Sequence, residues 1–234
     1  MTLHFINAQL IDPEAGTVTR GTLRVEDGKI AAVLDDTAPI PGDAQVVDCR
    51  GKYLAPGIVD LGVKVCEPGE RHKESFRSAG LAAAAGGVTT MVTRPDTDPT
   101  IDSPEVLEFV TRRANEAAPV NVVPMAALTK GRQGREMSEI GFLLDAGAVA
   151  FTDGDNVVTD TKVLSRAMTY ARSLGALVIG HPQDPGLSKG AAATSGKFAS
   201  LRGLPGVSTW RCARGGRAAG RVPGSPGSSV LQSR

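Results

Sequence analysis

Residues 88–126, VTTMVTRPDTDPTIDSPEVLEFVTRRANEAAPVNVVPMA, contain one complete repeat of the pattern that decides the fold. Two apolar runs, 88–93 and 120–126, are rich in β-branched residues and predict strands, while 104–117 has the spacing of an amphipathic helix. Strands that are apolar along their whole length and alternate with helices are typical of a parallel sheet buried on both faces.

The same alternation continues on both sides of this stretch. The further elements that we predict are strand 58–65, helix 74–86, helix 136–145, strand 147–151, helix 160–174 and strand 176–180. Periodicity alone leaves open a (β/α)8 barrel or a doubly wound sheet. Gly86 and Gly87 lie between a helix and a strand, where termination of the helix explains them without a phosphate ligand.

A small β unit precedes this region. Residues 3–11, 20–26 and 29–34 have the composition of strands, and Asp27-Gly28 between the last two is a strong hairpin signal. We therefore predict an N-terminal β domain over residues 1–57 and a βα domain over residues 58–208.

The composition is that of an ordinary soluble protein, with 234 residues, 41% hydrophobic and 22% charged. No apolar run approaches the roughly 20 residues of a membrane-spanning helix, and the first residues do not resemble a signal peptide, so we expect a cytoplasmic protein. The three cysteines, Cys49, Cys66 and Cys212, have no CxxC spacing, which predicts reduced thiols rather than disulfides.

The last 26 residues differ from the rest of the chain. Residues 209–234 hold five Arg and no acidic residue, so the net charge of +1 leaves 1 − 5 = −4 for residues 1–208, which argues against nucleic-acid binding. Their Gly, Arg, Ser and Pro bias predicts a disordered basic tail. A linker or interaction arm is one interpretation; a reading-frame slip, which we favour, would be revealed by translating the gene beyond codon 208 in the other frames.

Five short motifs occur in an order that resembles the dihydroorotase family of the amidohydrolase superfamily. They are Gly51-Lys52 through Pro56-Gly57-Ile58-Val59-Asp60, Glu67-Pro68-Gly69, Gly86-Gly87-Val88-Thr89-Thr90, Pro95-Asp96-Thr97-Asp98-Pro99 and Ala150-Phe151-Thr152-Asp153. Each motif is weak alone, but five in sequence are specific. The resemblance covers residues 3–208 and implies a β-sandwich beside a (β/α)8 barrel with zinc at the carboxyl end of the strands.

In that family, strand 1 ends in Asp-x-His-x-His-x-Arg, and both histidines bind zinc. Here the segment reads Asp60-Leu61-Gly62-Val63-Lys64-Val65-Cys66. Gly62 has no ligand atom, and the ammonium of Lys64 has no lone pair for a metal. The resemblance therefore implies that the usual binuclear zinc site does not form here, so that zinc is absent or weakly bound.

The resemblance also assigns the other site positions. The arginine that holds the substrate carboxylate falls at Cys66, and its asparagine helper falls at Asp96, so both substrate positions are substituted. Asp153 and His181 match two remaining metal ligands. The later ligands and the general base follow strands 6 and 8 of the family, for which this sequence has no recognisable strands, so about five βα units of an incomplete barrel are expected.

Three interpretations of these side chains stay open. His181 is either a metal ligand or, as we favour, a hydrogen-bonded structural histidine. Lys64 either takes the place of the metal and neutralises Asp153, or extends into solvent. Cys66, His181 and Asp153 could together form a mononuclear zinc site, although a free cysteine is more often a small buried hydrophobe.

Three functions follow. The first is a noncatalytic member of this pyrimidine-biosynthesis family that serves as a structural partner of the aspartate transcarbamoylase catalytic chain, as noncatalytic members of the family do. The second is an active zinc-dependent dihydroorotase, which interconverts dihydroorotate and N-carbamoyl-L-aspartate with a metal-activated water. The third is a truncated product without function. An incomplete barrel also predicts an oligomer or a chain that is unstable alone.

Overall fold

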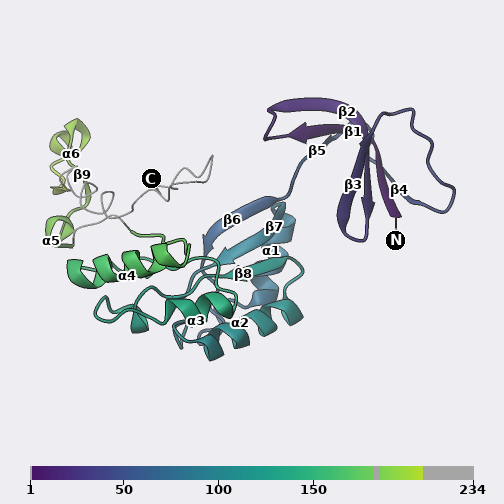
Figure 1. Ribbon diagram of the computed structural model, residues 1–234. Coiled ribbons are helices and arrows are strands. Elements are labelled where there is room, and N and C mark those ends of the chain that lie inside the picture. Colours follow the sequence, from purple (N-terminus) through teal and green to yellow (C-terminus); the bar gives the residue numbers. More distant parts are fainter. Residues whose placement is uncertain (1, 182–184, 208–234) are drawn as a thin grey trace. The chain divides into compact units, whose positions relative to one another are not determined.

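The computed structural model describes residues 2–181 and 185–207, and divides into two compact units with the boundary between Ile58 and Val59 (Figure 1). Both units are built on β-sheets, and in the residues that the structure describes all helices belong to the second unit. Among the described residues, none of the helices has the length and apolar character needed to cross a membrane.

The first unit is a mixed five-stranded sheet with the order β3-β2-β1-β4, in which β5 also pairs with β1. Its strands are β1 (Thr2–Asp12), β2 (Thr17–Glu26), β3 (Lys29–Leu34), β4 (Gln45–Asp48) and β5 (Tyr53–Leu54). The predicted hairpin is confirmed, because Glu26 pairs with Lys29 across Asp27 and Gly28, whose φ values are 49° and 77°. The described part of this unit forms one sheet, and the second layer of a sandwich is not seen in it.

The second unit contains a sheet with the order β6-β7-β8, and β7 and β8 run parallel. Its elements up to residue 173 are β6 (Ile58–Val63), α1 (Phe76–Ala85), β7 (Val88–Thr93), α2 (Pro104–Ala117), β8 (Asn121–Pro124), a 3-10 turn (Lys130–Arg132), α3 (Ile140–Asp145) and α4 (Thr161–Ser173). Parallel bridges from Ala126 to Phe151 and from Phe151 to Val178 extend the pairing by two positions. Five strand positions thus lie side by side, and no closed barrel is seen in the described residues.

Several predicted elements are confirmed to the residue and others are shorter than predicted. Strand 88–93 and helix 104–117 are β7 and α2, and the main-chain N–H of Gly86 closes α1 on the carbonyl oxygen of Ala82 at 3.1 Å. The predicted strands 147–151 and 176–180 are reduced to single bridges at Phe151 and Val178. These runs are apolar enough for strands, but each makes too few ladder contacts to be one.

The predicted helix 136–145 is wrong in its first turn, since α3 begins only at Ile140. The reason is local competition for hydrogen bonds. The main-chain N–H of Ser138 donates to the carbonyl of Leu128, and its hydroxyl donates to that of Ala127 at 2.6 Å. Residues 136–138 therefore pair with the segment after β8 instead of entering the helix.

Small elements also occur beyond residue 184, where the sequence showed no recognisable strands. They are α5 (Pro185–Ser188), β9 (Ala193–Thr194), α6 (Lys197–Leu201) and β10 (Gly206–Val207), and the two strands pair in parallel. The predicted disordered tail, residues 209–234, lies outside the described residues.

The main hydrophobic core lies between the sheet and the helices, and its largest buried side chains include Phe76, Phe151, Leu107 and Leu143. A second, smaller cluster consists of Val92, Met125 and Ala150, with Ile179 against it. Successive strand residues point to opposite faces. Because Met91 belongs to the first cluster and Val92 to the second, the smaller cluster lies on the face that turns away from the helices, which is the interior side of a barrel.

Candidate functional site

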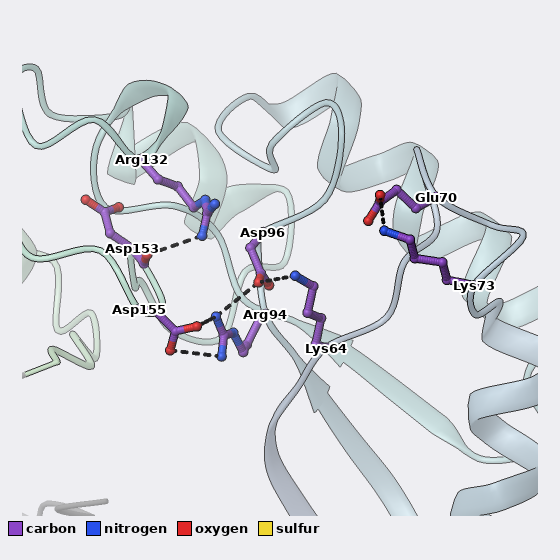
Figure 2. A network of polar contacts seen from close by, with 8 residues as sticks. All are labelled: Lys64, Glu70, Lys73, Arg94, Asp96, Arg132, Asp153 and Asp155. Atoms are coloured by element: carbon purple, nitrogen blue, oxygen red, sulfur yellow. Dashed lines mark hydrogen bonds and ion pairs between the residues drawn. The ribbon is translucent and has the colours of Figure 1, made fainter. Parts of the chain in front are cut away.

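Charged side chains gather where the strands of the second unit end, which is the edge at which βα proteins place their sites (Figure 2). Lys64 follows β6, Arg94 and Asp96 follow β7, and Asp153 and Asp155 follow the bridge at Phe151. Of the site positions given by the family resemblance, the structure thus brings Lys64, Asp96 and Asp153 to one place.

Asp153 is buried and held entirely by groups of the protein. Its Oδ1 accepts hydrogen bonds from the main-chain N–H groups of Leu128 and Thr129, both at 3.0 Å, and its Oδ2 accepts one from the Thr129 hydroxyl at 2.5 Å. The same hydroxyl accepts the N–H of Gly134. Burial raises the pKa of Asp153 above its ordinary value, although these hydrogen bonds act in the opposite direction.

Lys64, Arg94, Asp96 and Asp155 form a chain of ion pairs, which we call the mouth network (Figure 2). The ammonium of Lys64 lies 3.3 Å from Oδ2 of Asp96, and Nη2 of Arg94 lies 3.0 Å from the same oxygen. Arg94 also reaches Asp155, with Nη2 2.7 Å from Oδ2. Since the Asp96 side chain is only 5% exposed, two cations meet on one buried carboxylate.

The expectation that Lys64 neutralises Asp153 is therefore wrong in its partner. Lys64 pairs with Asp96, while the carboxylate of Asp153 is turned to Leu128 and Thr129. The alternative, that Lys64 extends into solvent, is half right, because its side chain is 54% exposed although its ammonium is paired.

The ion pairs of the mouth network also shift the pKa values of Asp155 and Arg94. The hydrogen bond from Arg94 lowers the pKa of Asp155, and the positive charges of His181 and Lys64 add to that effect against desolvation. The hydrogen bond to Asp155 raises the pKa of Arg94 in turn. His181, which is half-buried, therefore lies close enough to the network for its charge to act on Asp155.

Gly62 has no side chain to bind a metal, and its backbone conformation is also unfavourable for a residue that has one. Its φ is +88°, a value that residues with a side chain rarely adopt, although a Cβ added at this position would meet only open space. A histidine at this position would be strained in the present backbone. Cys66, at the position of the family arginine, is a half-buried free thiol.

The loop between β6 and α1 has an anchor of its own, the buried carboxylate of Glu67. Its Oε2 accepts the main-chain N–H of Phe76 at 2.9 Å, and its Oε1 accepts Nε of Arg113 on α2 at 2.7 Å, with Arg71 3.5 Å away. Burial opposes ionisation of Glu67, but these contacts outweigh it and lower its pKa. The segment that follows Lys64 is thus fixed by both helices.

Four participants in this site were missed from the sequence. Arg94 and Asp155 carried a signal, since they flank the predicted strand end at 93 and the recognised Asp153. Thr129 and Arg132, which contact Asp153 through the hydroxyl and through an Nη1 to carbonyl hydrogen bond of 3.4 Å, carried none. They come from a turn 24 and 21 residues away from Asp153.

The donor set does not fit the zinc centre that the family implies. Zinc takes three or four protein ligands, preferably thiolate, imidazole and carboxylate. Both oxygens of Asp153 already accept hydrogen bonds, and Arg132 donates to its main-chain carbonyl (Figure 2). Lys64 and Arg94 are both paired with the neighbouring Asp96. In the part of the chain that the structure describes, no three His, Cys, Asp or Glu side chains form a group that could hold a metal, and this includes Cys66, His181 and Asp153.

Comparison with known proteins indicates the same family as the sequence motifs. Residues 51–215 match the dihydro-orotase-like family. The chain belongs to this family. It is 38% identical over 201 residues to a dihydroorotase of Syntrophus aciditrophicus, covering 86% of this chain and 47% of that protein. It is 40% identical over 208 residues to a dihydroorotase-like protein of Pseudomonas putida, covering 88% and 49%. The chain thus spans about half the length of these dihydroorotase-like relatives.

Solved structures of the amidohydrolase superfamily have the same fold. An L-hydantoinase from Arthrobacter aurescens superimposes with a TM-score of 0.69 at 22% identity, covering 79% of this chain and 41% of that one. A D-hydantoinase gives 0.65 at 24% identity, covering 80% and 41%. Of the predicted fold class, the α/β fold shared with these barrel proteins is confirmed, whereas the closed barrel and the β-sandwich are not seen in the described residues.

Proposed function

We propose that this chain is a noncatalytic dihydroorotase-like protein of pyrimidine biosynthesis that acts in the cytoplasm as a structural partner of the aspartate transcarbamoylase catalytic chain. The observation that carries the noncatalytic part is the pairing of Lys64 and Arg94 on Asp96 at the mouth. Lys64 occupies the position of a family metal ligand, Arg94 pairs with the same carboxylate, and neither cationic side chain can ligate a metal.

An ammonium and a guanidinium supply positive charge but no Lewis acidity. The family reaction, hydrolysis of the dihydroorotate ring amide to N-carbamoyl-L-aspartate or its reversal, uses a metal to activate water. At pH 7 neither Lys64 nor Arg94 lowers the pKa of a water molecule in that way. The substrate positions agree with this proposal, because Cys66 offers no bidentate contact to a carboxylate, and the carboxylate of Asp96 would repel an anionic substrate unless its two cations shield it.

The partner in this proposal rests on the resemblance to noncatalytic family members. The β-sandwich that the resemblance implies belongs to the proposal as well, with the five-stranded sheet of residues 2–54 as one layer. Co-purification of the tagged 234-residue chain with an aspartate transcarbamoylase catalytic chain tests the partnership. A stable complex at micromolar concentration is expected; separate elution of the two proteins would remove the partner from the proposal.

Activity is tested on the purified full chain after growth with added zinc. Zinc content is measured by mass spectrometry, and turnover is followed in both directions with dihydroorotate and N-carbamoyl-aspartate. The Syntrophus aciditrophicus relative, 38% identical and named a dihydroorotase, serves as the positive control. We expect substoichiometric zinc and no turnover above the protein-free reaction. Near-stoichiometric zinc with turnover would establish the active zinc-dependent dihydroorotase instead.

A further inference from the structure

The turn that carries Arg132 is held in a strained conformation. Gly131 and Arg132 have φ values of 56° and 55°, in the left-handed region that residues with a side chain rarely adopt. The main-chain N–H of Gly131 donates to Asp102 at 2.7 Å, and the side chain of Asn156 donates to the carbonyl of Arg132 at 2.9 Å. Backbone strain that is maintained by surrounding contacts in this way is typical of functional sites.

The guanidinium of Arg132 is only partly used by the protein. Its Nη1 donates to the main-chain carbonyl of Asp153 at 3.4 Å, and its buried Nε has no hydrogen-bond partner in the described residues (Figure 2). Arg135, three residues further along, is exposed. In the part of the chain that the structure describes, neither arginine forms an ion pair with a carboxylate. Two neighbouring guanidinium groups therefore retain donors for an anion.

A third guanidinium, that of Arg94, approaches Arg132 over the backbone of Gly154. A Cβ on Gly154 would stand 2.9 Å from Nη2 of Arg94 and 3.4 Å from Nη1 of Arg132, and the φ of Gly154 is +63°. A glycine at this position leaves room for both side chains. Arg94 is already paired with Asp96 and Asp155. Positive groups that converge in this way stabilise an oxyanion placed beside them.

An open cavity of about 610 Å³ lies against this turn. Most of its lining side chains are charged or polar, and they include Arg132, Gln133, Arg135, Asp155, Asn156 and Thr159. Its volume is in the range of small-molecule sites. From this geometry we propose that the cavity binds a phosphate group, with Arg132 and Arg135 donating to the phosphate oxygens. The uncharged amide and hydroxyl side chains would contact whatever the phosphate is attached to.

A phosphate group matches these residues better than a carboxylate does. Phosphate has three terminal oxygens and a charge between −1 and −2 near pH 7, which suits two forked guanidinium groups, whereas one guanidinium already saturates a carboxylate. The substrate positions given by the family resemblance, Cys66 and Asp96, are not among the lining residues. The inference therefore goes beyond the proposed function, and it does not depend on zinc content, turnover or the transcarbamoylase partner.

The test is calorimetric titration of the full 234-residue chain with inorganic phosphate, glycerol phosphate and succinate at constant ionic strength. We expect saturable binding of phosphate with a Kd of about 1 mM or lower, and weaker binding of succinate. Tighter binding of glycerol phosphate than of inorganic phosphate would identify a monoester as the ligand, and equal binding would identify free phosphate. Absence of phosphate binding, or tighter binding of succinate, would overturn the inference.

Substitution of Arg132 separates binding from structure. Arg132→Asn should weaken phosphate binding about tenfold or more, because it removes the guanidinium. Asparagine tolerates the left-handed conformation better than arginine does, so the variant should not lower Tm. A lower Tm with unchanged phosphate affinity would show that Arg132 has a structural role only, and would overturn the inference.

Two exposed positions complete the test. Arg135→Met should also weaken phosphate binding, whereas Arg112→Met, the matched control on α2 beside Phe109, should leave the affinity unchanged. Asp155→Asn should strengthen binding, because it removes a carboxylate whose side chain is 78% exposed and releases Arg94. Equal weakening by Arg135→Met and Arg112→Met would overturn the inference, since the anion would then respond only to overall charge.

Discussion

The residues that follow β6 and those that follow the bridge at Phe151 are held in place by different contacts. Asp153 after Phe151 accepts three hydrogen bonds from Leu128 and Thr129, so its carboxylate has a structural task that needs no metal. The end of β6 has Gly62, with positive φ, and Lys64, which reaches across to Asp96. A family ligand can thus persist for reasons unrelated to the metal, and its presence alone does not indicate a metal site.

The largest effect should come from removing the Asp153 carboxylate. Asp153→Ala leaves three buried donors without an acceptor and should lower the free energy of unfolding by about 3 kcal/mol. Asp153→Asn keeps an acceptor for the two N–H groups and should cost about 1 kcal/mol or less. Urea unfolding measures both, with exposed Asp145→Ala as the control. Zinc that stabilises the parent chain but neither variant would make Asp153 a metal ligand after all.

Breaking the mouth network at its centre should have the next largest effect. Arg94→Met leaves the buried Asp96 with Lys64 alone and should cost about 2 kcal/mol in unfolding free energy. Lys130→Met, which breaks the exposed pair with Glu136, is the control and should cost much less than Arg94→Met. If both variants lose the same amount in urea unfolding, the network has no special weight.

The pH dependence of the free energy of unfolding should reveal the raised pKa of Asp153. We expect this effect to be smaller than those of the two substitutions above. Because the folded-state pKa of Asp153 is raised, the folded chain keeps a proton that the unfolded chain has released, and stability falls as pH rises through that window. Asp153→Asn abolishes this contribution. Its stability relative to the parent should therefore increase with pH.

Asp155 and Glu67 have the opposite sign, since their lowered pKa values give stability that is lost as pH falls. Both carboxylates are present in the parent and in the Asp153→Asn variant, so their contributions cancel in the difference between the two unfolding curves. A difference that does not change with pH would contradict the raised pKa of Asp153.

The smallest effect is expected for Lys64→Met, because this side chain is half exposed. The variant should lose at most about 1 kcal/mol, and high salt should reduce the loss. In the Arg94→Met background the same substitution should cost more, since Asp96 would then have no cation, and a double-mutant cycle measures that coupling. Strict additivity would show that the two cations act independently on Asp96.

Local patterns in the sequence predicted the helices and strands correctly where local signals determine them. The prediction failed where contacts between distant segments determine the structure. β7 and α2 are confirmed to the residue because the apolar spacing that predicted them is a local signal. The first turn of the predicted helix 136–145 was lost to Ser138 hydrogen bonds with residues 127 and 128. That pairing depends on the position of β8.

The sequence predicted where the site residues lie better than it predicted which of them form ion pairs. Asp96, Asp153 and Lys64 lie at the expected mouth, but the partner of Lys64 was predicted incorrectly. Which carboxylate an ammonium reaches depends on side-chain directions at the strand ends, which the sequence pattern does not specify. Thr129 could not be predicted, because any of several turn residues could have supplied the hydroxyl that holds Asp153.

The Glu67 carboxylate joins the start of α1 and the side of α2 to the loop through Phe76 and Arg113, using no side chain of residues 62–66. The side chains at positions 62, 64 and 66 can therefore be exchanged while the Glu67 anchor and the buried Val65 keep the loop in place. New side chains installed there, whether metal ligands or a receptor for another small molecule, would inherit a loop that does not have to be redesigned with them.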